Sequence, residues 1–236
     1  MKHYIIILIC LGSFGLLKAQ SVIGAWEGNY TAEDGIPLKS VVIFADGYQV
    51  LTTYNARTGE FLNTNGGTWS LEDNIMSELV EFNTEAPETV GETFSFEVSI
   101  TDTTLQIVGT EMQFKRIDSG APGALQGAWL MSGRMRDGET EMRNTNTPRK
   151  TMKILSGTRF QWIAYNTETK QFMGTGGGTY ITKDGIYTEN IEFFSRDISR
   201  VGASLEFNYE LKDGNWHHSG LSSKGDPIYE IWSLRE

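Results

Sequence analysis

Carboxylate and imidazole side chains late in the chain offer the residue types best suited to proton transfer. Glu189 and Glu192 lie three residues apart, and His217 and His218 are adjacent. A carboxylate and an imidazole within hydrogen-bond reach of one cavity can act as general acid and base on a bound substrate. These four residues are the catalytic candidates.

The strand-like surroundings of these residues limit what they can do together. Successive side chains of a strand point to opposite faces, so Glu189 and Glu192 are expected on opposite faces, as are His217 and His218. A metal site needs three or four converging ligands. With Cys10 in an N-terminal apolar stretch and only two histidines beyond that stretch, we expect no metal site.

A glycine-rich segment, Gly174 to Thr179, has the composition of a phosphate-binding loop. That mechanism requires a helix N-terminus after the glycines, whereas this segment continues into strand-like residues. We interpret it as a bulged barrel corner, where glycine relieves crowding. The chain also lacks a Gly-x-Ser-x-Gly motif, a metalloprotease helix motif and a dinucleotide fingerprint, and we expect no cofactor.

Aromatic and polar side chains that could line a ligand cavity are dense in the second half of the chain. In the stretch from Arg159 to Asn166, odd-numbered and even-numbered residues occupy opposite faces. Each face carries a long polar or aromatic side chain, as a cavity with a few fixed polar groups requires. The ligand-binding candidates are Arg159, Trp162, Tyr165, Tyr187, Glu189, His217, His218 and Glu230.

An internal repeat indicates which secondary-structure elements carry and position these residues. Residues Tyr54 to Phe82 and Tyr165 to Phe193 align without a gap at a constant offset of 111 positions. A fixed period indicates that one supersecondary plan occurs twice. We expect the shared positions, such as Glu78 with Glu189, to serve the fold, and positions elaborated in one copy to serve function.

Apolar and polar residues alternate in short runs throughout both copies, separated by turn signals such as Asp46-Gly47. This pattern predicts half-buried strands. The fold class is therefore all-β, with two tandem antiparallel up-and-down β-barrels of about eight strands each; two-sheet β-sandwiches are the alternative. The expected division is a signal peptide (1–20), a first barrel (21–117), a linker (118–126) and a second barrel (127–236).

Each copy opens with Gly-x-Trp and closes with an arginine, an arrangement that resembles the calycins, the lipocalins and their relatives. The resemblance implies that the arginine lies across the indole at one end of the barrel, where a cation–π contact closes it. It covers nearly all of residues 24–235, and it aligns the endings Glu111 to Arg116 and Glu230 to Arg235 at an offset of 119. The signature residues are Gly24, Trp26 and Arg116 in the first copy, and Gly127, Trp129 and Arg235 in the second.

The first 20 residues have a basic start and an apolar run from Tyr4 to Leu17, typical of a secretory signal cleaved near Ala19 or Gln20. We expect a secreted or periplasmic protein with no membrane span after cleavage. Without Lys2 and Lys18, 18 basic residues face 30 acidic ones. A net charge near −12 repels phosphate backbones, so nucleic acid is not an expected partner. The oligomeric state is left open.

Three functions fit these observations. The first is binding of a small apolar or amphipathic molecule in the second barrel, with the first barrel a structural or weaker copy. The second is a cofactor-independent enzyme acting on a small glycoside, lipid or carbonyl compound. The third is a surface module that binds protein or polysaccharide through an exposed aromatic strip.

Overall fold

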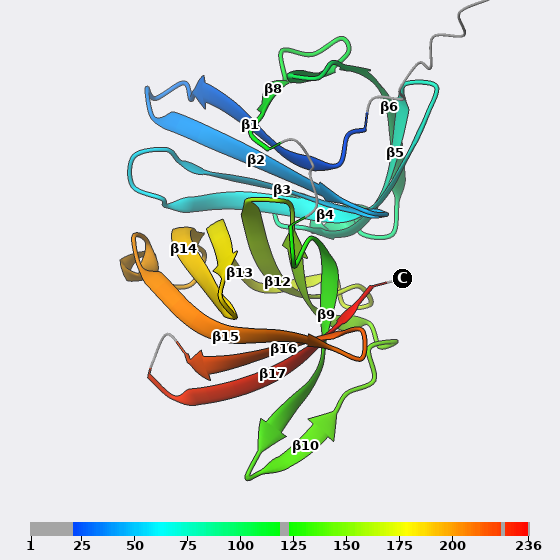
Figure 1. Cartoon of the computed structure of the whole chain (residues 1–236). Helices are drawn as coiled ribbons and strands as arrows, with labels where there is room; N and C mark the ends of the chain where they lie inside the picture. The colour runs from blue at the N-terminus through cyan, green and yellow to red at the C-terminus, as the bar shows by residue number, and fades with distance from the viewer. Residues whose placement is uncertain (1–20, 119–122, 223–224, 236) are drawn as a thin grey trace, which may run out of the picture.

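The computed structural model describes residues 21–118, 123–222 and 225–235, and the expected signal peptide lies outside this part of the chain. Two closed antiparallel barrels follow each other along the chain, so the predicted all-β tandem-barrel fold is confirmed (Figure 1). The first barrel is formed by β1 (Gly24–Thr31), β2 (Pro37–Ala45), β3 (Tyr48–Asn55), β4 (Phe61–Glu72), β5 (Ile75–Asn83), β6 (Thr93–Ile100), β7 (Thr104–Ile107) and β8 (Gln113–Arg116).

The second barrel repeats this order, with β17 pairing back to β9, and adds one strand. The extra strand, β10, pairs only with β9 and projects from the bottom of the molecule in Figure 1. Two short 3-10 turns, Pro87–Thr89 and Ile198–Arg200, follow the equivalent strands Ile75–Asn83 and Ile186–Phe194. The strands are β9 (Gly127–Arg136), β10 (Glu139–Met142), β11 (Arg149–Leu155), β12 (Arg159–Asn166), β13 (Gln171–Lys183), β14 (Ile186–Phe194), β15 (Ser204–Lys212), β16 (Asn215–Leu221) and β17 (Pro227–Leu234).

Tight hairpin turns connect many neighbouring strands. Asp184 and Gly185, between β13 and β14, have φ values of 51° and 80°. Positive φ at both central residues is the geometry that matches the right-handed twist of antiparallel strands, and Asp-Gly adopts it readily. The predicted glycine-rich corner is also confirmed, because the pairing of β13 with β14 shifts between Gly177 and Gly178.

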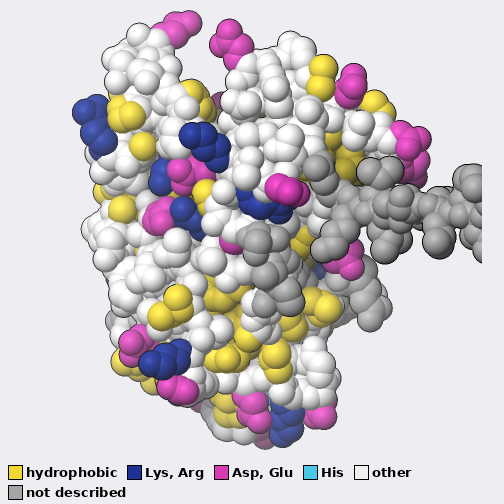
Figure 2. All heavy atoms as spheres, turned by 45° about the horizontal axis from the view of Figure 1, so that its top comes forward, with side chains coloured by type: hydrophobic (Ala, Val, Ile, Leu, Met, Phe, Trp, Pro, Cys, Tyr) yellow, Lys and Arg dark blue, Asp and Glu magenta, His cyan; other side chains and the backbone are white. Residues whose placement is uncertain are grey.

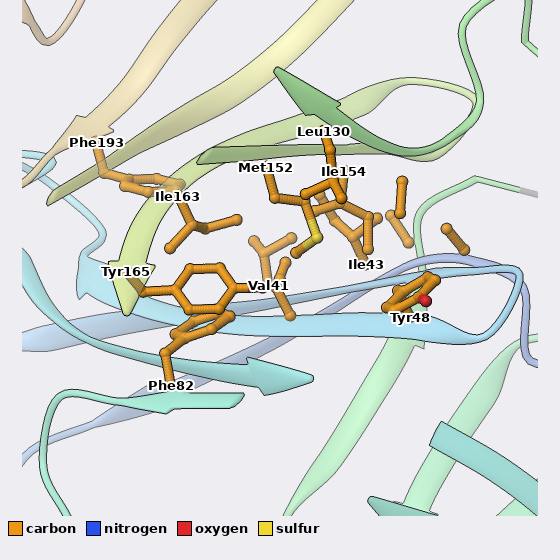
Figure 3. Close-up of a cluster of buried hydrophobic side chains, with 14 of the residues drawn as sticks. Val41, Ile43, Tyr48, Phe82, Leu130, Met152, Ile154, Ile163, Tyr165 and Phe193 are labelled. Atoms are coloured by element: carbon orange, nitrogen blue, oxygen red, sulfur yellow. The ribbon is translucent and has the colours of Figure 1, made fainter. Parts of the chain in front are cut away.

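Three apolar clusters hold the molecule together. One fills the first barrel around Trp26 and Phe44, and another fills the second barrel around Tyr187 and Trp216. The third lies between the barrels (Figure 3) and takes side chains from both, including Ile43. Burial of apolar surface is the main stabilising term in folding, so the inter-barrel contact is itself a core.

The contacts between the barrels are reciprocal. The Tyr54 hydroxyl donates a hydrogen bond of 2.7 Å to Glu192, and the Tyr165 hydroxyl donates one of 2.5 Å to Glu81. Both pairs are related by the repeat offset of 111, and Phe61 stacks on its own repeat partner, Phe172, with ring centres 5.9 Å apart. Such reciprocity is the mark of a two-fold symmetric interface. The repeated stretch therefore builds the face on which the two barrels meet.

Charged side chains of both signs are interspersed on the face shown in Figure 2, and the described residues there form no extended basic surface. Among the residues described, no helix combines the length and the apolar composition needed to span a bilayer.

Candidate functional site

A buried ion pair lies inside the second barrel. The Lys153 ammonium on β11 is 2.7 Å from the Glu189 carboxylate on β14, and only 7% and 6% of the two side chains are exposed. Burying two charges is costly unless they are paired in good geometry. The pair places a fixed dipole inside a barrel with largely aromatic walls.

Aromatic rings surround the Lys153 ammonium. Its nitrogen lies 5.0 Å from the ring centre of Trp216 and 5.2 Å from that of Tyr187. The ring centres of Phe207 and Trp232 lie 5.9 and 5.3 Å from the same nitrogen. All four distances are within the reach of a cation–π interaction. The ring faces thus provide the ammonium with part of the stabilisation that water supplies outside.

A second polar pair, His218 and Glu230, lies in the same interior. Nδ1 of His218 is 3.3 Å from Oε2 of Glu230, but the two are not aligned as a hydrogen bond. Burial, together with the charge of Lys153, lowers the pKa of His218. Burial opposes ionisation of Glu230, yet His218 and Lys153 hold its pKa below the usual value. At neutral pH the site therefore holds a neutral imidazole beside a carboxylate.

Four buried polar atoms in this interior make no well-aligned hydrogen bond to the described residues, although Glu230 lies 3.3 Å from one of them. They are the Tyr187 hydroxyl, the Trp216 indole nitrogen and both ring nitrogens of His218. A buried polar atom without a partner costs about 1–3 kcal/mol, and native proteins rarely leave several together. An ordered water or a bound molecule would satisfy them.

A gap in the barrel wall lies beside this cluster. Strand β9 pairs with β11 only as far as Leu130 opposite Met152, and from Gly133 onward it pairs with β10. A pocket of about 390 Å³ occupies the gap, and Met131 both lines it and packs against the barrel core. The basic side chains that line the pocket are Arg143, Arg149 and Lys150.

The structure brings together five of the sequence-predicted residues. Tyr187, Glu189, His218 and Glu230 share the barrel interior, and Trp162 packs against the same core.

The remaining candidates lie elsewhere, because alternation carries them to the other face of the barrel wall. Arg159 and Glu192 form a 2.5 Å ion pair at the inter-barrel face, where Tyr165 also lies. His217 faces away from the barrel core, and its Nδ1 is 2.9 Å from the Tyr229 hydroxyl. These four side chains are engaged with protein partners outside the interior cluster.

Lys153 is the functional candidate that sequence reasoning missed. Lys153 is a charged residue between the apolar residues Met152 and Ile154, at the position that Val42 occupies in the first copy. This difference between the two copies could have identified Lys153 as a candidate from the sequence. In the part of the chain that the structure describes, no group of three or more potential metal-ligating side chains converges.

The arginine–indole contact occurs in the first barrel. The Arg116 guanidinium lies 3.9 Å from the ring centre of the fully buried Trp26. It also donates hydrogen bonds to the carbonyl oxygens of Ser21, Ile23 and Asp102.

The expected second contact, between Arg235 and Trp129, does not form. Trp26 pairs with Arg116, whereas Trp129 pairs with Leu234, so the true offset at this strand is 118 and not 119. A one-residue shift moves a side chain to the opposite face. Arg235 accordingly points to the inter-barrel face, where it forms a two-pronged ion pair with Glu81 at 2.6 and 2.9 Å.

Residues 124–234, which span the second barrel, match a family model described as a domain of unknown function, DUF4488. A comparison with curated proteins finds no match.

Proposed function

We propose that the second barrel binds a small amphipathic molecule in its interior. The observation that carries the proposal is the group of four unpartnered polar atoms of Tyr187, Trp216 and His218 in an aromatic-walled barrel. The closure of this half of the chain into an antiparallel barrel is compatible with the same function.

The chemistry of the interior defines the ligand class. Indole and hydroxyl donors favour a molecule with hydrogen-bond acceptors at one end, and the aromatic walls favour an apolar body. The ligand enters through the gap between β9 and β11, where Met131 is the unbranched side chain between the pocket and the core. Methionine adapts its shape readily, which suits an entry point.

Ligand-dependent melting shifts and tryptophan quenching across lipid, pigment and sugar panels test this function. Tyr187→Phe removes a buried hydroxyl that has no well-aligned partner, so the apo protein should melt at the wild-type temperature or above it while the affinity falls about tenfold. Tyr180→Phe is the matched control, since that hydroxyl already donates to the Ser156 carbonyl at 2.6 Å. A flat response to every panel, or an unchanged affinity in Tyr187→Phe, contradicts the proposal.

One observation favours the enzymatic alternative. Glu189, His218 and Glu230 share one interior, as proton transfer to a small glycoside, lipid or carbonyl compound requires. Turnover of such a substrate that is lost in His218→Asn and retained in His217→Asn would support it. Each aromatic residue of the second copy is buried or half-buried, which disfavours a surface module with an exposed aromatic strip.

We also propose that the protein is secreted or periplasmic. The basic and apolar pattern of residues 1–20 supports this location. Intact-mass measurement of the exported protein should show removal of a leader that ends near Ala19 or Gln20.

A further inference from the structure

The first barrel contains an interior cavity of about 190 Å³ that carries one charged side chain, Glu78. The rest of the lining is apolar except for the amides of Gln49 and Asn65. Within the described part of the chain, Glu78 makes no hydrogen bond or ion pair. Glu78 is half-buried, and its carboxylate at this largely apolar cavity lacks the partner that buried charges normally have.

The second barrel shows what that partner is. Glu78 and Glu189 are repeat counterparts, with equivalent strand pairings opposite Trp69 and Tyr180. Glu189 is neutralised by the Lys153 ammonium at 2.7 Å. At the position of Lys153 the first barrel has Val42, which also lines the cavity. The first barrel thus retains the carboxylate and lacks the ammonium.

The first barrel also retains two of the four aromatic rings that surround the Lys153 ammonium in the second barrel. Phe207 and Trp232, which face Lys153, correspond to Phe96 and Phe114 in the first barrel, and both phenyl rings line the cavity. The other two rings are replaced by the flexible or smaller side chains of Met76 and Leu105. This replacement leaves space at the two positions where the second barrel has the rings of Tyr187 and Trp216.

We propose that the first barrel binds a small organic ammonium with an apolar body, whose charged nitrogen pairs with Glu78 as Lys153 pairs with Glu189. The ligand nitrogen takes the place of the lysine ammonium, and its alkyl or aryl body occupies the apolar remainder of the cavity. Desolvation raises the pKa of this carboxylate to about 7, and a bound ammonium would offset that penalty. This site is separate from the one proposed in the second barrel.

Isothermal titration at pH 8 with hexylamine, 1-hexanol and hexanoate as probes of equal length tests the charge requirement. We expect hexylammonium to bind roughly tenfold or more tightly than hexanol, and hexanoate to bind most weakly. Glu78→Gln should abolish the preference for the ammonium. Glu97→Gln is the matched control, because Glu97 is an exposed glutamate of the same barrel on β6 and should leave the preference unchanged.

Val42→Lys supplies a second, independent arm. It installs the arrangement of the second barrel, so the introduced ammonium should pair with Glu78 and block hexylamine binding in a protein with a native circular dichroism spectrum. Equal affinity for hexylamine and hexanol, or an undiminished preference for the ammonium in Glu78→Gln, would overturn the proposal. Glu78→Gln and Val42→Lys both change the first barrel. A negative result with them would therefore leave the Tyr187→Phe test of the second barrel unaffected.

Discussion

At the scale of single residues, Glu78 should leave a measurable mark on stability. Burial raises its pKa to about 7, above the ordinary value of 4.5. Between these values the folded protein holds a proton that the unfolded chain releases, so this group makes the free energy of unfolding decrease as pH rises from about 4.5 to 7. Above pH 7 its ionised form destabilises the fold by about 1–3 kcal/mol.

Urea unfolding of wild type and Glu78→Gln at pH 5 and pH 8 measures this effect. The two proteins should have similar stability at pH 5, and the variant should be more stable by about 1–3 kcal/mol at pH 8. None of the cavity-lining residues contributed by the other strands carries a charge, so the difference reports Glu78. An identical pH trend in both proteins would contradict the assignment.

The residue types of the interior were predictable from sequence, but their partners were not. Alternation correctly separates Glu189 from Glu192 and His217 from His218, since each pair lies on opposite faces of the barrel wall. Alternation cannot say which face is inward, and Arg159 and Tyr165 were therefore placed with the ligand candidates. Arg235 was misassigned because a one-residue change of register is invisible in a sequence with a variable loop.

At the scale of elements, the two bulge glycines are equivalent and should be equally intolerant of substitution. A Cβ atom at Gly67 would collide with the Leu79 carbonyl oxygen, and one at Gly178 with the Asn190 carbonyl oxygen. Both collisions are with backbone, which cannot move without breaking the barrel. We expect Gly67→Ala and Gly178→Ala to lose about 3 kcal/mol or more of unfolding free energy.

The matched control for the bulge glycines is Gly47→Ala in the β2–β3 turn. Gly47 has a φ of 70° and open space around its Cβ position, so only conformational strain of about 1–2 kcal/mol applies. Thermal or urea unfolding of the three variants distinguishes the two causes. Bulge variants no less stable than Gly47→Ala would show that the barrel corners can relax.

Most strands were predictable from their alternating or continuous apolar residues, although β2 and β3 are buried on both faces. The exception is β10, whose four residues are all exposed. A fully exposed strand has no apolar alternation, so residues 134–148 gave no strand signal and the gap between β9 and β11 could not be foreseen. The pocket at that gap depends on an excursion that the first copy lacks, because β1 connects to β2 by a short turn.

At the scale of the whole molecule, the inter-barrel face should depend strongly on its buried arginine. Arg235 and Glu81 are each only 11% exposed and form a bidentate pair. Removal of one partner leaves the other charge buried and uncompensated, which costs about 3–5 kcal/mol. Arg235→Ala should therefore lower the unfolding free energy by that amount. In contrast, Arg134→Ala breaks a pair with Glu141 that is 33% and 45% exposed, and should cost less than about 1 kcal/mol. Equal losses in chemical denaturation would mean that the inter-barrel pair is dispensable.

The shared core also predicts how the molecule unfolds. The division into two domains at residues 118–126 follows from the sequence repeat, and two independent domains would unfold separately. However, Ile43 of the first barrel packs in one cluster with Met152 and Ile163 of the second (Figure 3). Val50 of the first barrel belongs to the same cluster, and all four side chains are 2% exposed or less. Unfolding either barrel alone would expose the other half of that cluster, at about 25 cal/mol for each Å² of apolar surface. We therefore expect a single calorimetric transition with equal calorimetric and van't Hoff enthalpies. Two resolved transitions, or survival of one barrel after proteolysis at the connection, would show that each barrel is stable without its neighbour.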